Sequence, residues 1–191
     1  VIISRSGPDN YQNLHRHADA QVVVNTTPVG MYPDNGSSPL SLKALPNCQL
    51  VLDMVYNPLR TALMLEAEAL GIPARNGLLM LAAQAQCASQ LWGQFPAGED
   101  MAPAIHDALG RRMRSIALIG MPGSGKTVVG KALARLTGRP LYDTDDLLQE
   151  LAGMPIPRIF ETQGEPALRS YETQALARAG ALSGSIIATG G

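Results

Sequence analysis

Gly120-Met-Pro-Gly-Ser-Gly-Lys-Thr127 is the most informative segment of this chain. The apolar run Ile116–Ile119 precedes it and a helical pattern from Val128 to Leu136 follows, which predicts a strand, a glycine-rich loop and a helix. The segment fits GxxxxGK[ST], the pattern of a phosphate-binding loop. Glycines allow backbone N–H groups to turn inward around phosphate oxygens, and the helix that follows adds the positive end of its dipole.

This loop predicts a nucleotide site. Lys126 supplies a point charge for the β- and γ-phosphates, and Thr127 supplies a hydroxyl for Mg²⁺. The other loop residues that we assign to the cofactor are Gly120, Gly123, Ser124, Gly125 and Val128. The alternative is an ordinary glycine-rich turn between a strand and a helix.

The composition permits a packed core. The chain has 191 residues, of which 46% are hydrophobic and 16% charged, so it can form one domain or two small ones. The net charge of −1 argues against a nucleic-acid surface held by bulk charge, and no stretch is apolar and long enough to cross a membrane. Cys48 and Cys87 stand in no ligand spacing, so we expect reduced core cysteines and a reducing, cytoplasmic compartment. The histidines have no partner at metal spacing and are expected on the surface.

Short strands alternate with helices before the loop, which predicts a parallel α/β sheet. We expect strands at Val1–Ile3, Gln21–Val24, Leu50–Asp53 and Ile72–Arg75. We expect helices from Asp9, as the cap, to about Ala18, at Thr61–Leu70, from Leu78 to about Trp92, and at Met101–Leu109. The segment Gly110–Arg114 is expected to be a solvated basic linker, with a phosphate-attracting patch as the alternative.

Polar residues follow several of these strands, where ligands of parallel sheets bind. Arg5 can hold an anionic group such as a ribose 2′-phosphate, or it is a surface arginine. Asn25 is either a ligand or a turn former. Asp53 is more typical of a helix cap or a backbone lock than of a catalyst. Gln84, taken alone, is typical of an exposed helix position.

Three segments, in this order and at this spacing, resemble the C-terminal half of shikimate dehydrogenase: Asn25–Met31, Asp53–Pro58 with Thr61, and Asn76–Ala85 with Trp92. The resemblance covers residues 1–113 and implies a partial Rossmann-type NADP-binding domain for the interconversion of shikimate and 3-dehydroshikimate. It implies that Arg5 holds the NADP 2′-phosphate and that Tyr56 and Gln84 face shikimate. It places the remaining cofactor contacts at Asn25, Met54, Gly77 and Met80. The family's dinucleotide loop and catalytic Lys–Asp pair are not among these residues.

Carboxylates follow the next strand expected after the loop, Arg139–Tyr142. Asp143, Asp145 and Asp146 can cap the following helix. Beside a phosphate-binding loop, one of them can also hold Mg²⁺ through water, and another can accept a hydroxyl proton as that oxygen attacks the γ-phosphate.

Two features later in the chain, an arginine and a pair of glycines, could also contact a ligand. Arg169 stands at helical spacing from Glu165 and Glu172, where it can grip a substrate carboxylate or form a surface ion pair. The expected strand Ile186–Ala188 ends in Thr189-Gly190-Gly191, whose bare glycine backbone permits close approach of a ligand.

The motifs GMPGSGKT, YDTDD, IFETQGEPALRSYE and IIATGG resemble shikimate kinase over residues 114–191. The resemblance implies a partial P-loop domain with a parallel sheet, of the nucleoside-monophosphate-kinase type, and ATP-dependent phosphorylation of the shikimate 3-hydroxyl. By this resemblance Lys126 and Thr127 serve ATP and Mg²⁺, and Asp143 orients the water on the metal. Asp145 binds shikimate hydroxyls and is the base. Arg169 binds the shikimate carboxylate, and Gly190 and Gly191 close around the ring.

We therefore interpret the chain as the junction of a bifunctional shikimate dehydrogenase–shikimate kinase of aromatic amino-acid biosynthesis. We expect this fragment to be inactive alone and to expose apolar faces. The oligomeric state stays open. Two alternatives remain: a non-catalytic P-loop nucleotide-binding or regulatory protein with a degenerate Rossmann piece, and an artefactual join of two neighbouring genes.

Overall fold

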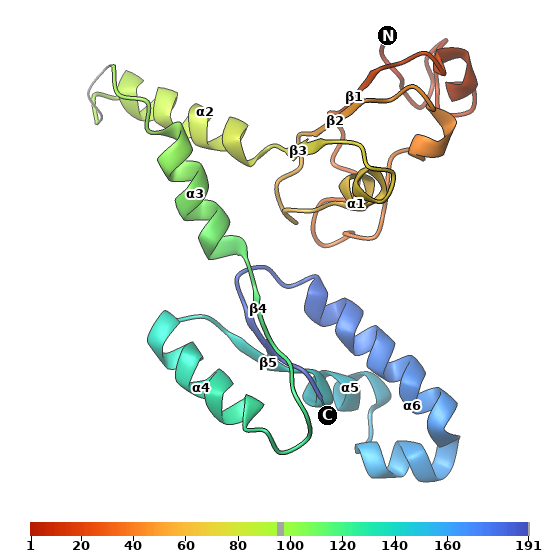
Figure 1. Ribbon diagram of the computed structural model, residues 1–191, viewed down its shortest axis with the longest axis vertical. Helices are drawn as coiled ribbons and strands as arrows, with labels where there is room; N and C mark the ends of the chain where they lie inside the picture. The colour runs from red at the N-terminus through yellow and green to blue at the C-terminus, as the bar shows by residue number, and fades with distance from the viewer. Residues whose placement is uncertain (95–97, 191) are drawn as a thin grey trace. The chain divides into compact units, whose positions relative to one another are not determined.

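The computed structural model describes residues 1–94 and 98–190, and it divides into two compact units, 1–110 and 111–191 (Figure 1). Each unit contains a three-stranded sheet, with strand order β1-β2-β3 in the first and β4-β6-β5 in the second. All strand pairs in these sheets are parallel. The α/β fold class predicted from the sequence is therefore confirmed.

The sheet of the first unit consists of β1 (Val22–Asn25), β2 (Leu50–Asp53) and β3 (Ala74–Asn76). Asn25 pairs in register with Asp53, and Asp53 with Asn76, so the three polar strand ends share one edge. The helices that follow these strands are α1 (Ala62–Ala69) and α2 (Leu78–Leu91), and short 3₁₀ turns lie at Leu14–His17 and Leu42–Ala44. The expected strand Leu50–Asp53 is confirmed to the residue, and the other predicted elements of this sheet shift by one or two positions.

Helix α1 joins the sheet to the hydrophobic core of the first unit. Thr61 caps it, since the hydroxyl accepts a hydrogen bond from the Met64 amide at 3.3 Å. Leu63 and Ala67 are one turn apart on the helix and completely buried. They pack with a cluster that also contains Val23, Leu42, Leu45, Cys48 and Val51.

The beginning of the chain differs from the prediction. Val1–Ile3 form no strand, because a strand needs a hydrogen-bonded neighbour along its length and only Ser4 makes a single bridge, to Asn10. Asp9 caps no helix. Its carboxylate instead lies 2.9 Å from Nε2 of His17, which is partly buried rather than on the surface.

Most of the segment Gly110–Arg114, which was expected to be a solvated linker, is helical. Helix α3 (Ala102–Met113) continues through it. Its last carbonyls have partners, since the Arg139 guanidinium donates to the Arg111 oxygen at 2.7 Å and the Gly184 amide to the Met113 oxygen at 2.8 Å. These long-range caps satisfy groups that a free helix end would leave to water, so the helix extends further than its local sequence predicts.

The two cysteines differ in environment. Cys48 is buried in the core as predicted, whereas Cys87 is exposed on α2, so its expected core position is wrong. Neither forms a disulfide. Within residues 1–94 and 98–190, no group of three histidine, cysteine or acidic side chains is placed to hold a metal. No helix in the same ranges has the length and apolar character needed to cross a membrane.

The sheet of the second unit places the chain's last described strand in the middle. β6 (Ile186–Ala188) lies between β4 (Ile116–Leu118) and β5 (Leu141–Asp143), and all three of its residues are buried. Register pairs Ala188 with both Leu118 and Asp143. The loops that follow β4, β5 and β6 therefore leave the sheet at the same edge.

Three helices accompany this sheet: α4 (Lys126–Thr137), α5 (Thr144–Ala152) and α6 (Ile156–Gly180). Leu147 and Leu148 of α5 and Ile159, Ala175 and Ala179 of α6 form a buried cluster with Ile187 of the central strand. Helix α6 is kinked at Gly164, whose φ of 79° lies in the left-handed region that favours glycine, and Pro166 follows within the next turn. The kink separates Arg169 from the first part of the helix.

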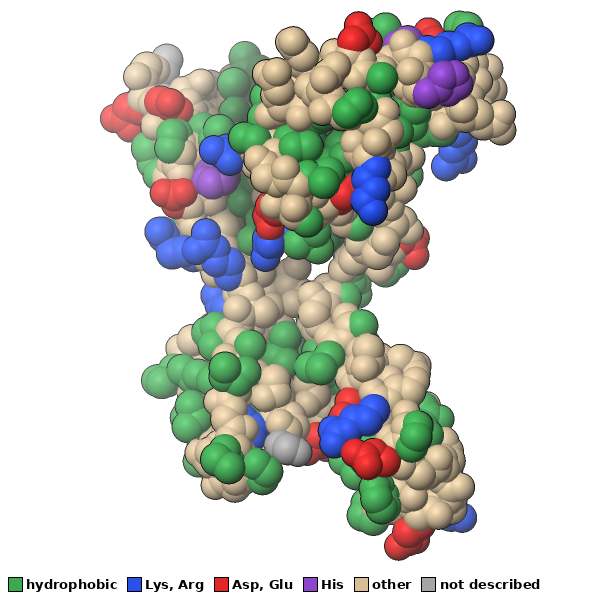
Figure 2. Space-filling view, turned by 45° about the vertical axis from the view of Figure 1, so that its right-hand side comes forward, with side chains coloured by type: hydrophobic (Ala, Val, Ile, Leu, Met, Phe, Trp, Pro, Cys, Tyr) green, Lys and Arg blue, Asp and Glu red, His purple; other side chains and the backbone are tan. Residues whose placement is uncertain are grey.

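Apolar side chains remain exposed on both units, in agreement with the expectation above (Figure 2). The most exposed in the second unit belong to the loop after β4 and to α4: Ile119, Met121, Val128 and Leu136. In the first unit they include Leu91 and Trp92 at the end of α2.

Candidate functional site

The glycine-rich loop has the backbone geometry that its sequence predicts. Gly123 and Gly125 adopt φ angles of 73° and 84°, a region that residues with a Cβ rarely enter. Gly125 is the residue immediately before α4. The amides of the first helical turn have no partners further back in the helix, so they and the helix dipole favour an anion at this end.

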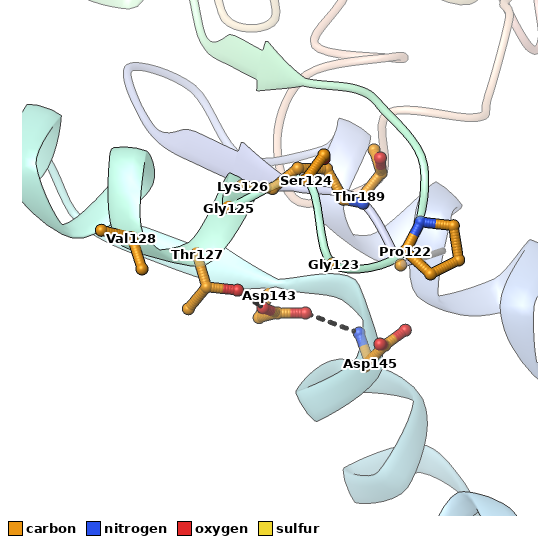
Figure 3. A pocket seen from close by; sticks show the side chains of 11 residues that line it. Pro122, Gly123, Ser124, Gly125, Lys126, Thr127, Val128, Asp143, Asp145 and Thr189 are labelled. Carbon is orange, nitrogen blue, oxygen red and sulfur yellow. Dashed lines mark hydrogen bonds between the residues drawn. The ribbon is translucent and has the colours of Figure 1, made fainter.

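A cavity of about 410 Å³ opens at this loop (Figure 3). Its lining comes from three strand ends: the loop after β4, Asp143 at the end of β5 with Asp145 beyond it, and Thr189 and Gly190 after β6. The loop contributes Pro122, Gly123, Ser124, Gly125, Lys126, Thr127 and Val128. The structure thus brings together the predicted loop residues and the predicted carboxylates, although Gly120 does not belong to the lining.

Lys126 is held by the loop itself. Its Nζ donates to the carbonyl oxygens of Gly120 at 2.7 Å and Met121 at 2.9 Å. These contacts keep the ammonium group within the wall of the cavity, where a point charge attracts phosphate oxygens.

Asp143 caps a helix, one of the roles that the sequence left open, and also contacts the phosphate loop. Its Oδ1 accepts a hydrogen bond from the Asp145 amide at 3.1 Å and so caps α5, while its Oδ2 accepts from the Thr127 hydroxyl at 3.1 Å (Figure 3). A hydroxyl and a carboxylate side by side are the hard oxygen ligands that Mg²⁺ prefers. The pair can therefore hold Mg²⁺ directly or through water.

Asp145 has an unusual electrostatic environment. Partial burial raises the pKa of its carboxyl above the ordinary value, and the negative charges of Asp143, Asp146 and Glu172 raise it further, while Lys126 opposes the shift. A carboxylate with a raised pKa is a stronger proton acceptor than an exposed aspartate.

A second cavity of about 240 Å³ adjoins this carboxylate. It is lined by α5 and α6 and by the segment after β6: Thr144, Asp145, Leu148, Arg169, Glu172, Ala175, Leu176, Thr189 and Gly190. Asp145, Thr189 and Gly190 line both cavities, so the carboxylate stands where the two spaces meet.

Arg169 lies in the wall of the second cavity and also forms the ion pairs that the sequence offered as an alternative. Its guanidinium contacts Glu172 at 2.8 Å and Glu165 at 3.3 Å, and its side chain is 65% exposed. The planar, multiply donating group is thus held in place and remains accessible to a carboxylate.

The backbone after β6 passes very close to Asp145. A Cβ placed on Gly190 would lie 2.1 Å from Oδ1 of Asp145, so any larger residue here would require the carboxylate to move. The Gly190 amide donates to the hydroxyl of Thr144 at 2.7 Å.

Gly191, also predicted to contact the substrate, lies outside the described residues. Sequence reasoning missed Thr144 and Thr189; the signal for Thr144 was a hydroxyl residue between two functional aspartates.

The first unit contains a separate cavity of about 390 Å³. The loops after β1 and β2 form it, with Thr26, Thr27, Pro28, Met31, Tyr32, Met54, Val55, Tyr56 and Asn57. Of the residues predicted for this half, Met54 and Tyr56 are brought together here. Gly77 packs against the same loop, since a Cβ on it would lie 2.1 Å from the Met54 oxygen.

The other residues predicted for the first unit do not line this cavity. Arg5 is exposed in a bend, and Met80 and Gln84 are exposed on α2. Asn25 is buried, and its Oδ1 accepts from the amide of Thr27 at 3.0 Å and from its hydroxyl at 2.7 Å, which is the turn-forming alternative.

Asp53 has the structural role that the sequence analysis called a backbone lock, since its carboxylate holds neighbouring loops in place through hydrogen bonds. Its Oδ1 accepts from the Asn25 side-chain amide and from the Val55 backbone amide, both at 3.0 Å, and its Oδ2 accepts from the Thr61 hydroxyl at 2.6 Å. Asn25, Asp53 and Thr61 are all buried. This network ties the ends of β1 and β2 to the start of α1 and holds the two loops that form the cavity.

Comparison with known proteins gives a different relative for each part of the chain. Residues 122–191 match the shikimate kinase family. The shikimate kinase of Dechloromonas aromatica is 46% identical over 78 residues, which are 41% of this chain and 43% of that protein.

The N-terminal part is similar to solved shikimate dehydrogenases. A chorismate mutase/shikimate 5-dehydrogenase fusion protein from Clostridium acetobutylicum matches with a TM-score of 0.50 and 27% identity, over 57% of this chain and 44% of that one. Shikimate dehydrogenase 1 from Peptoclostridium difficile matches with a TM-score of 0.51 and 28% identity, over 57% of this chain and 43% of that one.

The chain spans less than half the length of each of these proteins. Within that span, the comparisons confirm both resemblances inferred from the motifs, with the kinase segment following the dehydrogenase segment. This order is consistent with a dehydrogenase–kinase fusion.

Proposed function

We propose that this chain carries the ATP- and shikimate-binding part of a shikimate kinase, joined to the NADP-binding part of a shikimate dehydrogenase, with the division between residues 113 and 114. The two activities handle the same small molecule: the dehydrogenase interconverts 3-dehydroshikimate and shikimate, and the kinase phosphorylates the 3-hydroxyl of shikimate. Small-molecule substrates and a cytoplasmic location are part of this proposal.

One observation carries the kinase proposal: Asp145 stands where the phosphate-loop cavity meets the cavity that contains Arg169. A hydroxy acid with its carboxylate on Arg169 would present a hydroxyl to Asp145. Asp145 would accept the hydroxyl proton as the oxygen bonds to the γ-phosphorus, and the bond from that phosphorus to the bridging oxygen of ADP would break.

The other residues of the first cavity would support this transfer. Lys126 would bind the β- and γ-phosphates, and Thr127 and Asp143 would hold Mg²⁺. Bound Mg²⁺ would neutralise negative charge on the phosphates. The metal residues fit that ion, because the structure pairs a hydroxyl with a carboxylate oxygen at 3.1 Å at the edge of the phosphate loop.

A direct test is the release of ADP from ATP by the native polypeptide with and without shikimate. We expect release to depend on shikimate and to yield one shikimate phosphate for each ADP. Tight ATP binding without shikimate-dependent turnover would instead favour the non-catalytic P-loop alternative. A mass measurement of the native polypeptide tests whether both parts belong to one chain.

Lys126→Ala should weaken the binding of ATP·Mg²⁺ by about 10- to 100-fold, since charge-assisted hydrogen bonds contribute about 1.5–3 kcal/mol. Isothermal titration of the native polypeptide measures the effect. Lys131→Ala is the matched control, because Lys131 is an exposed lysine on the same helix and outside the cavity lining. Equal affinities for the Lys126 variant and the parent would rule out the phosphate-binding assignment.

The dehydrogenase proposal rests on the structural similarity of the N-terminal part and on its predicted cofactor residues. Arg5→Ala in the native polypeptide should raise the Michaelis constant for NADP⁺ by about 10- to 100-fold and leave that for NAD⁺ unchanged, because only NADP⁺ has a 2′-phosphate for the guanidinium. Arg16→Ala, at another exposed arginine, is the control. Equal changes for both cofactors would show that Arg5 has another role.

A further inference from the structure

The two cavities of the second unit share a wall made of the backbone at Thr189 and Gly190. On one side this wall is attached to β4: the amide and the hydroxyl of Thr189 both donate to the Leu118 oxygen, at 3.1 Å and 3.0 Å. On the other side, the Gly190 amide donates to the Thr144 hydroxyl at 2.7 Å. Thr144 is the first residue of α5 and is 5% exposed, so the acceptor of this short hydrogen bond is buried, although the Gly190 end is only partly so.

The same wall lies close to the carboxylate of Asp145. A Cβ on Gly190 would lie 2.1 Å from Oδ1 and 3.1 Å from Cγ of Asp145, so the glycine backbone covers this side of the carboxylate. A small displacement of Gly190 would therefore change both the space beside Asp145 and the access of water to it. Since Thr144 immediately precedes Asp145 in the chain, one helix end holds both the carboxylate and the wall that covers it.

We propose that Thr144 is a positioning residue for phosphoryl transfer, whose hydroxyl holds the Gly190 backbone against Asp145 and thereby fixes the wall shared by the two cavities. This rests on the proposed kinase function. Thr144 would touch neither the transferred group nor the nucleotide phosphates; it would act through Gly190 and Asp145.

Thr144→Val in the native polypeptide tests the proposal, because valine keeps the shape of threonine and replaces its hydroxyl by a methyl group. The Gly190 amide would lose its acceptor, and the wall would move away from Asp145. We expect kcat for shikimate phosphorylation to fall by about 10- to 100-fold, since misplacement by about 1 Å can reduce a rate by about 10²-fold. The Michaelis constant for shikimate should rise, and that for ATP should stay within about twofold, because the phosphate loop itself is unchanged.

The split between the two substrates provides a reading that a loss of general stability would not produce. A destabilised protein would lose ATP and shikimate affinity together, whereas a displaced Gly190 would affect kcat and the Michaelis constant for shikimate and leave that for ATP unchanged. Thr144→Ser should restore both kcat and the Michaelis constant for shikimate, because serine retains the hydroxyl.

Thr137→Val is the matched control. Its hydroxyl donates to the Leu133 oxygen at 2.7 Å at the end of α4 and lies outside both cavity linings. It should leave kcat and both Michaelis constants unchanged. Parental kinetics for Thr144→Val, or a Ser variant as impaired as the Val variant, would overturn the proposal.

Hydrogen exchange at the Gly190 amide keeps the test decisive if Thr144→Val does not fold. We expect slow exchange in the parent and in Thr144→Ser; exchange as fast as that of a solvated loop amide would overturn the proposed contact. This measurement does not depend on turnover. A native polypeptide with a protected Gly190 amide and no shikimate-dependent ADP release would refute the kinase function while confirming the hydrogen bond.

Discussion

Asp145→Asn is expected to reduce shikimate phosphorylation by about 10²- to 10⁴-fold, the contribution of a well-placed general base. The amide has nearly the shape of the carboxylate but cannot accept the hydroxyl proton. The affinity for ATP·Mg²⁺ should remain close to that of the parent, since the phosphate loop and the Thr127–Asp143 contact are untouched. Single-turnover kinetics and isothermal titration on the native polypeptide measure the two effects separately.

Two neighbouring aspartates supply the controls. Asp146→Asn alters an exposed carboxylate on the same helix turn, which lies outside both cavity linings, and should retain most of the activity. Asp143→Asn should instead change the dependence of the rate on Mg²⁺ concentration, since it removes a carboxylate from the metal pair. Identical phenotypes for Asp143 and Asp145 variants would contradict their separate roles.

The raised pKa of Asp145 also fixes the direction of two pH effects. The base must be ionised, so the rate should increase as pH rises through this raised pKa. Stability should change in the opposite sense: the folded state favours the protonated carboxyl, so its contribution is present at low pH and is lost as pH rises through the folded pKa. Asp145→Asn should therefore raise the melting temperature near neutral pH and have little effect in acid. A lower melting temperature at neutral pH would contradict this assignment.

Asp53→Ala is expected to lower the free energy of unfolding of the first unit by about 3 kcal/mol, because buried donors that lose their acceptor cost about 1–3 kcal/mol each and the costs are not additive. Donors from Asn25, Val55 and Thr61 would all be left without this carboxylate. The loops that form the 390 Å³ cavity would loosen with it.

Hydrogen exchange of the β2 amides in the native polypeptide gives the local free energy without assuming a single unfolding transition of both units. Asp34→Ala is the control, since Asp34 is exposed in the loop after β1, and its effect should stay within about 0.5 kcal/mol. Unchanged protection of β2 in Asp53→Ala would show that the network contributes little to stability.

Local sequence was sufficient for the features whose physical cause is itself local. The glycine pattern predicted the phosphate-binding loop because the φ angles of Gly123 and Gly125 exclude most other residues. The helices expected at Thr61–Leu70 and after the loop form where their sequences predict them, because Thr61 caps the first and the left-handed Gly138 ends the second. The order of strands and helices, and with it the α/β class, followed from the same short-range patterns.

Predictions failed where the cause was distant in the chain. Val1–Ile3 have the composition of a strand but no paired neighbour, and Gly110–Met113 remain helical because Arg139 and Gly184 supply partners for the helix end. The exposure of Cys87 likewise depends on which face of α2 is covered by other elements.

The arrangement of the site depends on pairing between strands that are far apart in sequence. The motifs predicted Asp145 and Gly190 as separate ligands, but their contact arises because β6 inserts between β4 and β5 and brings Gly190 to Thr144, 46 residues away. Parallel strands are joined by long connections, so no local preference specifies which strands become neighbours. Burial of the apolar strand Ile186–Ala188 between its two partners settles the order, and this order makes Asp145 common to both cavities.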